Sequence, residues 1–416
     1  MAQLSDDCFA FGGPMMSVDE AVALICERLH TITGSQTIPL VEADGRILCG
    51  DLLAGIPLPP FNNSAVDGFA VRAADLGSGV TRMPVAGRIE AGASVNITRD
   101  NSAIRIFTGA PVPSGFDTVF MQEDVTIGSD EFVELPAGLK PGANVRPAGE
   151  DIEKSSIAIK SGSRLTPSHV ALAAALGRTD LTVARKLKVA VFSTGNELVS
   201  PGENQSPPQV YDSNRFMLMA LLRRLGCNVS DLGILRDDRA VLARALARAA
   251  EDHDFILTSG GVSTGDADHV KGAVEDAGKL TFWRMAIKPG RPVAMGMISG
   301  TPFVGLPGNP VASFVTQAYV VRPAVLALMG ALPAPLMALP VRAAFSYKKK
   351  AGRREFARAK LRRAPDGVVE AVKFPREGAG LLSSLVETDG LVELREDITR
   401  VEPGESVGFI PYSSLY

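Results

Sequence analysis

The stretch that decides the fold is Thr258-Ser-Gly-Gly-Val-Ser-Thr-Gly-Asp-Ala-Asp268, which follows the apolar run 254–258. The run is typical of a buried strand, and the residues from about Ala267 to Ala277 are typical of a helix. Glycine lets backbone N–H groups approach a ligand closely, and a helix N-terminus favours negative charge. Because Asp266 and Asp268 would repel a bare anion, we expect a cation or a proton donor to take part. The stretch therefore predicts chemistry on a phosphate-bearing or oxyanion substrate with the help of a metal.

Strands and helices alternate regularly on both sides of this stretch, over residues 186–331. The sequence predicts strands at 187–192, 229–235 and 255–258, with helices at 214–225 and 239–250 between them. Such alternation predicts a mostly parallel α/β sheet that helices cover on both faces. Ligands bind sheets of this kind outside the carboxyl ends of the strands.

The rest of the chain differs from this α/β domain in composition. Residues 14–54 and 147–185 have helical and mixed patterns and predict one discontinuous framework domain. Residues 55–146 consist of short strand-like runs between Gly, Pro and Asn turns, which predicts an inserted β-rich domain. Residues 332–416 predict a separate C-terminal β domain, either a small barrel or a sandwich. The expected fold class is therefore α/β plus β, in several domains.

Composition excludes several classes of function for this 416-residue chain. A net charge of −3 gives no overall attraction to nucleic acid or to an anionic membrane. The cysteines form no CxxC pair and the histidines are scattered, which argues against a zinc or iron–sulfur site. The N-terminal residues do not resemble a signal peptide, and Arg322 and three prolines interrupt the apolar stretch 311–339. We therefore expect a cytoplasmic protein.

Polar and glycine-rich loops follow several strands of the predicted sheet and should meet along one edge. A single loop of this kind is more often an ordinary turn, and Asp268 alone could cap a helix. Five such loops on one edge favour a site. Carboxylates suit a hard cation such as Mg²⁺, and basic side chains would offset charge on an oxyanion. The charged candidates are Glu197, Asp237, Asp268, Arg284, Lys288 and Arg291.

Small residues of the same loops are the candidates for binding the phosphates of a substrate. They are Ser193, Thr194, Gly195, Gly260, Gly261, Ser263, Gly265, Pro307, Gly308 and Asn309. No Walker A sequence and no GxGxxG follows a strand, so the sequence does not support a P-loop or dinucleotide fold.

A second polar concentration lies where the inserted domain begins, in the segment 60–70. This segment has more polar residues than a turn needs, namely Asn62, Asn63, Ser64 and Asp67. Buried polar sets of this kind bind a ligand or close an interface.

Together these segments resemble the molybdopterin molybdenumtransferases of molybdenum-cofactor biosynthesis, the family that includes the gephyrin E domain. The resemblance spans almost the whole chain, in the family order. The matching segments are PPFNNSAVDGFAV (59–71), FTGAPVP (107–113), VRPAGEDI (145–152), FSTGNEL (192–198), YDSN (211–214), LGILRDD (232–238), TSGGVSTGDADHVK (258–271), FWRMAIKPGRP (282–292), GLPGNP (305–310), GRREFARAKL (352–361) and LLSSL (381–385).

The resemblance implies an elongated homodimer that inserts molybdate into the dithiolene of adenylylated molybdopterin, releases AMP and requires Mg²⁺. It also implies a composite cleft, in which the α/β domain of one subunit faces the inserted domain of the other. By position, the inserted domain would supply the catalytic residues Asp67 and Thr108, and the C-terminal domain would supply the substrate-binding residues Arg353 and Ser383. The α/β domain would supply the catalytic residues Glu197, Asp237, Asp268, Arg284 and Lys288, of which the three carboxylates would bind the metal.

The chain departs from the family pattern at a few positions. The family commonly has Met and Tyr where this chain has Val66 and Phe69, and often Lys where it has Arg284. Arginine keeps the charge but presents a planar fork instead of a point charge. The effect of Arg284 on substrate contact is left open, and within the pairs 353/354 and 383/384 the assignment could fall on either residue.

Two other functions stay open at this point. The first is the adenylylation of molybdopterin, because the α/β domain resembles that enzyme too, although its relatives are usually a lone α/β domain. The second is a non-enzymatic scaffold like gephyrin. The molybdopterin adenylyltransferase is a candidate delivery partner, and the sequence does not separate molybdate from tungstate.

Overall fold

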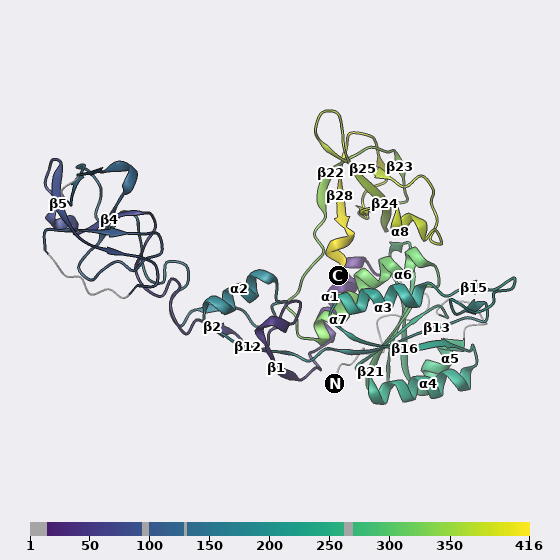
Figure 1. Ribbon diagram of the computed structural model, residues 1–416. Coiled ribbons are helices and arrows are strands. Elements are labelled where there is room, and N and C mark those ends of the chain that lie inside the picture. Colours follow the sequence, from purple (N-terminus) through teal and green to yellow (C-terminus); the bar gives the residue numbers. More distant parts are fainter. Residues whose placement is uncertain (1–14, 94–99, 129–130, 262–268) are drawn as a thin grey trace.

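The computed structural model describes residues 15–93, 100–128, 131–261 and 269–416. The chain forms an elongated molecule (Figure 1). The α/β domain and the C-terminal β domain lie side by side at one end, and the inserted domain stands apart at the other. The framework residues connect the two ends.

The α/β domain is built on a six-stranded sheet in the order β16-β13-β17-β21-β20-β18. The first four strands of this order pair in parallel, and the last two join antiparallel. This confirms the mostly parallel α/β sheet predicted from the sequence. The strands are β13 (Lys188–Thr194), β16 (Asn228–Leu235), β17 (Phe255–Ser259), β18 (Gly278–Arg284), β20 (Pro292–Ile298) and β21 (Thr301–Leu306).

Helices cover both faces of this sheet, because alternate side chains of the buried strands point to opposite faces. Val189 and Val191 of β13 belong to one core cluster, and Ala190 and Phe192 to another. The first core contains residues of α1 (Val18–Arg28) and α3 (Asn214–Arg224), and the second contains residues of α4 (Arg239–Asp252) and α5 (His269–Ala277).

The strand order places a topological switch point at β13. The chain leaves β13 through α3 to reach β16 on one side, and then returns through α4 to β17 on the other side. Loops that diverge at such a point leave a crevice at the carboxyl ends of the strands, where ligands of open α/β sheets bind.

Within the described residues, one helix, Pro310–Leu328, is both long and strongly apolar. It consists of α6 (Pro310–Thr316), the π-helical segment η4 (Gln317–Val321) and α7 (Arg322–Leu328). By length and composition it could cross a membrane, but 89% of its apolar window is buried inside the protein. It packs in the same core cluster as α1 and α3, so its apolar character is that of a core helix.

The framework is closed by pairing between segments that flank the insertion. β1 (Ser35–Pro39) pairs with β12 (Asp180–Ala184), and β2 (Leu52–Leu53) pairs with β11 (Ile157–Ile159). Helix α2 (Pro167–Ala175) packs with this framework. The chain between β2 and β11 forms the inserted domain, whose six-stranded sheet has the order β7-β4-β6-β5-β9-β8. Its strands are β4 (Gly68–Val71), β5 (Thr81–Ile89), β6 (Ala103–Ile106), β7 (Thr118–Met121), β8 (Thr126–Ile127) and β9 (Phe132–Leu135).

The C-terminal domain is a barrel, which decides between the barrel and the sandwich that the sequence allowed. Its strands follow the order β24-β25-β22-β28-β26, and β26 pairs back onto β24 to close the ring. These strands are β22 (Leu339–Ala343), β24 (Arg354–Arg363), β25 (Val369–Lys373), β26 (Gly390–Leu394) and β28 (Ser406–Pro411).

One short strand of the α/β domain extends this barrel sheet. β19 (Ile287–Lys288), which lies in a segment predicted only as a connecting loop, pairs in parallel with Arg354 and Glu355 of β24. The two domains therefore share backbone hydrogen bonds as well as side-chain contacts.

A buried guanidinium at the start of β24 ties the barrel to the N-terminal helix. The side chain of Arg354 is 3% exposed and binds Asp19 of α1 at 2.7 Å, Glu393 at 3.1 Å and Glu396 at 3.1 Å. Burial raises the pKa of the Glu393 carboxyl, while Arg354 opposes this shift. Without Arg354, Glu393 would be a buried charge that has lost the cation in direct contact with it.

We predict that Arg354→Met destabilises the barrel, because removing one partner of a buried ion pair costs about 3–5 kcal/mol. Arg362→Met on the same strand is the matched control, since its side chain is 61% exposed and its pair with Glu370 should contribute less than about 1 kcal/mol. Urea unfolding, monitored by circular dichroism, measures the stability of both variants. Equal midpoints for the two variants would contradict the prediction.

Candidate functional site

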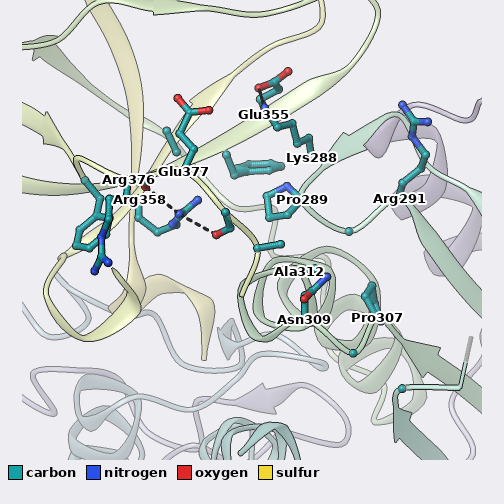
Figure 2. Close-up of a pocket in the computed structure, with 18 of the residues that line it drawn as sticks. Lys288, Pro289, Arg291, Pro307, Asn309, Ala312, Glu355, Arg358, Arg376 and Glu377 are labelled. Atoms are coloured by element: carbon teal, nitrogen blue, oxygen red, sulfur yellow. Dashed lines mark hydrogen bonds and ion pairs between the residues drawn. The ribbon is translucent and has the colours of Figure 1, made fainter. Parts of the chain in front are cut away.

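A cavity of about 640 Å³ opens where the carboxyl edge of the α/β sheet meets the barrel (Figure 2). Arg358 and Arg376 lie on the barrel side, and Pro307 and Asn309 lie on the side of α6. Many residues predicted for the rim line it together. They are Thr194, Gly195, Glu197, Asp237, Gly260, Gly261, Lys288, Pro307, Gly308 and Asn309.

The loop after β17 needs its first two glycines for backbone geometry. Gly260 has a φ of 89°, and a Cβ there would lie 2.6 Å from the carbonyl oxygen of Thr194. Gly261 has a φ of 67°, and its Cβ would lie 2.4 Å from a methyl group of Val270. Only glycine at these two positions therefore lets the loop pack closely on β13 and on α5. Because glycine has no side chain, the backbone of the loop is exposed to the cavity.

The acidic part of the cavity contains Glu197 and Asp237. Oδ1 of Asp237 is buried and has no hydrogen-bond partner among the residues that the structure describes. A buried carboxylate oxygen beside a cavity fits a hard cation, for which oxygen is the preferred ligand. Across the described ranges, no group of three or more His, Cys, Asp or Glu side chains is placed to hold a metal.

Three predicted site residues lie outside the described residues. These are Ser263, Gly265 and Asp268, the last of which is the third carboxylate of the predicted metal set. Arg284 ends β18, where its backbone pairs with Pro292, and its side chain is also outside what the structure describes. The roles of these four residues stay predictions.

The opposite wall of the cavity, here called the basic wall, belongs to the barrel and combines three cations with the carboxylates of Glu355 and Glu377. It contains Arg358, Lys373 and Arg376, with Lys288 and Arg291 at the junction with the α/β domain. The sequence reasoning missed the three barrel residues. A signal was present, since Arg358 lies inside the quoted segment 352–361, but no local pattern tells which strand residue faces a cavity.

Arg358 is the least solvated of these cations, at 7% exposure. Its Nε donates to Oγ of Ser384 at 3.0 Å and one Nη donates to the carbonyl oxygen of Gly378 at 3.1 Å. Burial lowers its pKa, and no ion pair joins it to a carboxylate among the residues that the structure describes. A buried guanidinium held only by neutral acceptors keeps its charge available to an anion in the cavity.

Lys288 belongs to a hydrogen-bonded network at the junction of the two domains. Its Nζ lies 3.1 Å from Oε2 of Glu355, which also accepts from the hydroxyl of Tyr347 at 2.8 Å. Arg353 binds the other oxygen of Glu355 at 2.7 Å. Burial would raise the pKa of Glu355, but these donors outweigh it and hold the pKa below its usual value. Glu355 is thus an ionised anchor that orients Lys288.

Three predicted substrate-binding residues are described but do not line the cavity. Ser193 is buried within β13 at 1% exposure. Arg353 binds Glu355, and Ser383 is next to Ser384, which holds Arg358. The cavity is lined instead by Thr194, which follows Ser193, by Glu355, which Arg353 binds, and by Arg358, which Ser384 holds.

The two predicted residues of the inserted domain contact each other. One carboxylate oxygen of Asp67 accepts from the backbone N–H and the hydroxyl of Thr108, both at 2.8 Å. These bonds lower the pKa of Asp67. The guanidinium of Arg105 lies near the rings of Phe69 and Phe107, at 4.9 and 5.2 Å. Figure 1 shows this domain far from the α/β domain of its own chain, so the structure does not bring the pair into that cavity.

Family models match the chain in three consecutive segments. The "MoeA N-terminal region (domain I and II)" matches residues 16–177, the "Probable molybdopterin binding domain" matches residues 190–327, and the "MoeA C-terminal region (domain IV)" matches residues 340–412. Together they follow the order of the framework with its insertion, the α/β domain and the barrel.

Relatives match this chain over nearly its whole length and theirs. A molybdopterin molybdenumtransferase of Haemophilus influenzae is 39% identical over 96% of this chain and 100% of its own. Molybdopterin molybdenumtransferase 2 of Mycobacterium tuberculosis is 38% identical over 94% of this chain and 98% of its own. A crystal structure of the molybdopterin biosynthesis moeA protein from Pyrococcus horikoshii covers 96% of this chain and 100% of its own at 28% identity, with a TM-score of 0.80. This chain therefore belongs to the molybdopterin molybdenumtransferase family.

Proposed function

We propose that this protein is a molybdenum insertase, which transfers molybdate to the dithiolene of adenylylated molybdopterin and releases AMP. One observation carries the proposal beyond family membership. A single cavity has a glycine-rich rim on one side and the basic wall on the other. Among the described residues, a carboxylate oxygen of Asp237 on the rim has no hydrogen-bond partner, and the guanidinium of Arg358 on the wall forms no ion pair. The first suits a cation on a phosphoanhydride, and the second suits a small oxyanion.

The basic wall supports molybdate as the substrate on the barrel side. Molybdate is a doubly charged oxyanion, and arginine presents fixed donors to oxygen atoms. Lys373 and Arg376 also line this wall, although Lys373 lies 3.4 Å from Glu377 and is partly neutralised. Lys288 lies between the two walls and would offset charge that develops during the transfer.

The acidic rim supports a magnesium ion on the α/β side. Asp237 and Glu197 would hold it together with the predicted Asp268. When bound, Mg²⁺ would neutralise charge on the phosphoanhydride and thereby ease its cleavage. The N–H of Gly260 already donates to the carbonyl oxygen of Leu306, so the backbone N–H of Gly261 would bind a phosphate oxygen.

The atoms of the proposed reaction balance in two parts. Water adds across the phosphoanhydride bond, which leaves AMP and the phosphate of molybdopterin. The two dithiolene thiols bind molybdenum, and one oxo ligand of molybdate leaves as water with their protons. Lys288 and Arg358 would hold the oxyanion in place while the sulfur atoms approach.

The position of the inserted domain supports a composite cleft in a homodimer. Asp67 and Thr108 form a connected pair on a domain that stands apart from the α/β domain of its own chain (Figure 1). A second subunit could bring this pair to the cavity, because a twofold interface places the same two surfaces together twice. Cytoplasmic location and delivery of the substrate by the adenylyltransferase are further parts of the proposal that rest on the sequence.

Direct assay of the purified protein tests the function. We expect AMP release from adenylylated molybdopterin only when Mg²⁺ and molybdate are both present, and a parallel reaction with tungstate measures selectivity. The alternative, adenylylation, predicts ATP consumption with molybdopterin instead. AMP release that is independent of both ions would contradict the proposed function.

Arg358→Met should weaken oxyanion binding, since losing charge-assisted hydrogen bonds raises the half-saturating molybdate concentration by about tenfold or more. Arg363→Met is the control, because Arg363 is an exposed cation at the end of the same strand. Molybdate titrations of AMP release measure both variants. The role of Arg358 would be excluded by a titration curve that coincides with that of the control.

Asp237→Asn should raise the Mg²⁺ concentration needed for activity by at least about tenfold, because it removes the charge of a ligand without changing its shape. The adjacent Asp238→Asn is the control. Asp238 caps α4 by accepting from the backbone N–H of Val241 at 2.8 Å, and asparagine caps a helix equally well. A Mg²⁺ titration that shifts equally in both variants would count against a metal at Asp237.

Mixing two inactive variants tests the composite cleft. Asp67→Ala removes the contribution of the inserted domain, and Asp237→Ala removes that of the α/β domain. After the two proteins are unfolded and refolded together, we expect about a quarter of wild-type activity, since half of randomly mixed dimers have one intact cleft. Each variant refolded alone should stay inactive, and no recovery in the mixture would exclude a shared cleft.

A further inference from the structure

Asn214 is a buried amide that contacts two of the cavity loops without lining the cavity itself. It is 8% exposed and begins helix α3. Its Nδ2 donates to Oγ of Ser259 at 2.8 Å and to the carbonyl oxygen of Gly308 at 2.7 Å. A carbonyl oxygen can only accept, so the nitrogen must face Gly308 and the orientation of the amide is determined.

The two partners of this amide belong to different loops of the cavity. Ser259 ends β17 and directly precedes Gly260 and Gly261, which line the cavity. Gly308 lies between Pro307 and Asn309, which line it as well. The loops also touch each other, because the N–H of Gly260 donates to the carbonyl oxygen of Leu306 at 3.0 Å. Asn214 is the side chain that joins both loops to a third element, α3.

The first turn of α3 is itself held in place. Nε of the adjacent Arg215 donates to Asp212 at 2.8 Å, and another nitrogen of its guanidinium pairs with Asp231 of β16. The side chain of Arg215 is 4% exposed, and that of Asp212 is 1% exposed. Such buried, hydrogen-bonded charges resist displacement, so the amide of Asn214 is presented from a rigid support.

We propose that Asn214 is a positioning residue that sets the spacing of the two glycine loops, and that it thereby controls the binding of the phosphate-bearing substrate. The enzymatic part rests on the proposed function. Fixed loops present their backbone N–H groups in one arrangement and lose less entropy when a ligand binds. The basic wall on the barrel has no contact with Asn214 among the bonds described, so oxyanion binding should not depend on it.

The test compares Asn214→Asp with two other variants of the full-length protein. Asn214→Asp keeps the shape of the side chain but replaces the double donor by oxygen. Ser259→Ala removes one of the two hydrogen bonds. Asn228→Asp introduces the same charge on an exposed residue at the distant start of β16 and serves as the control.

We expect Asn214→Asp to raise the KM for adenylylated molybdopterin by about tenfold or more, with kcat and the KM for molybdate within about twofold of wild type. Ser259→Ala should raise the first KM by about threefold, and Asn228→Asp should leave it unchanged. General damage to the fold would instead change the KM values for both substrates. Equal changes in both KM values would overturn the proposal.

Hydrogen exchange supplies a measurement that is independent of the reaction. In the ligand-free protein, Asn214→Asp should speed exchange in peptides that cover residues 257–261 and 304–313, while peptides of the barrel keep the wild-type rate. If Asn214→Asp does not fold, Ser259→Ala decides by the same measurement. Unchanged exchange in both loops overturns the positioning role. If Asn214→Asp speeds exchange in both loops but the wild-type protein releases no AMP, the positioning role of Asn214 stands and only the proposed function is contradicted.

Discussion

The pairing of β19 with β24 is the interaction on which the site depends. Backbone hydrogen bonds are obligatory for buried strands, and here one strand of the barrel satisfies them with two residues from the α/β domain, Ile287 and Lys288. This pairing brings the basic wall of the barrel to the carboxyl edge of the α/β sheet. The buried network of Arg354 holds the start of the same strand against α1. Without this junction the cavity would have one wall.

Charge is distributed unevenly between the two walls. The α/β side presents Glu197 and Asp237 with glycine backbone, and the barrel side presents Arg358, Lys373 and Arg376 beside the carboxylate of Glu377. Such separation lets one cavity accept a cation near one end and an oxyanion near the other, which a uniformly charged site could not do. The ionised Glu355 lies at the boundary and fixes Lys288 between the two.

Much of the α/β side could be predicted because its signals are local. A strand that ends in Gly260 and Gly261 puts these glycines at a sheet edge, and the topology rule places Glu197 and Asp237 on the same edge. The barrel side could not be predicted in this way. Family position points to Arg353 and Ser383, yet Arg358 lines the cavity. The direction in which a barrel side chain points depends on the closure of the barrel and the tilt of its strands.

The sequence by itself determined the kinds of domain, their order and the family, because periodicity, turn residues and motif order are properties of neighbouring residues. Tertiary structure alone decided that β19 joins the barrel, that Asn214 holds two loops at once, and that the inserted domain stands apart from the α/β domain of its own chain. These features depend on how segments far apart in the sequence are arranged in space, which is decided only when the whole chain folds.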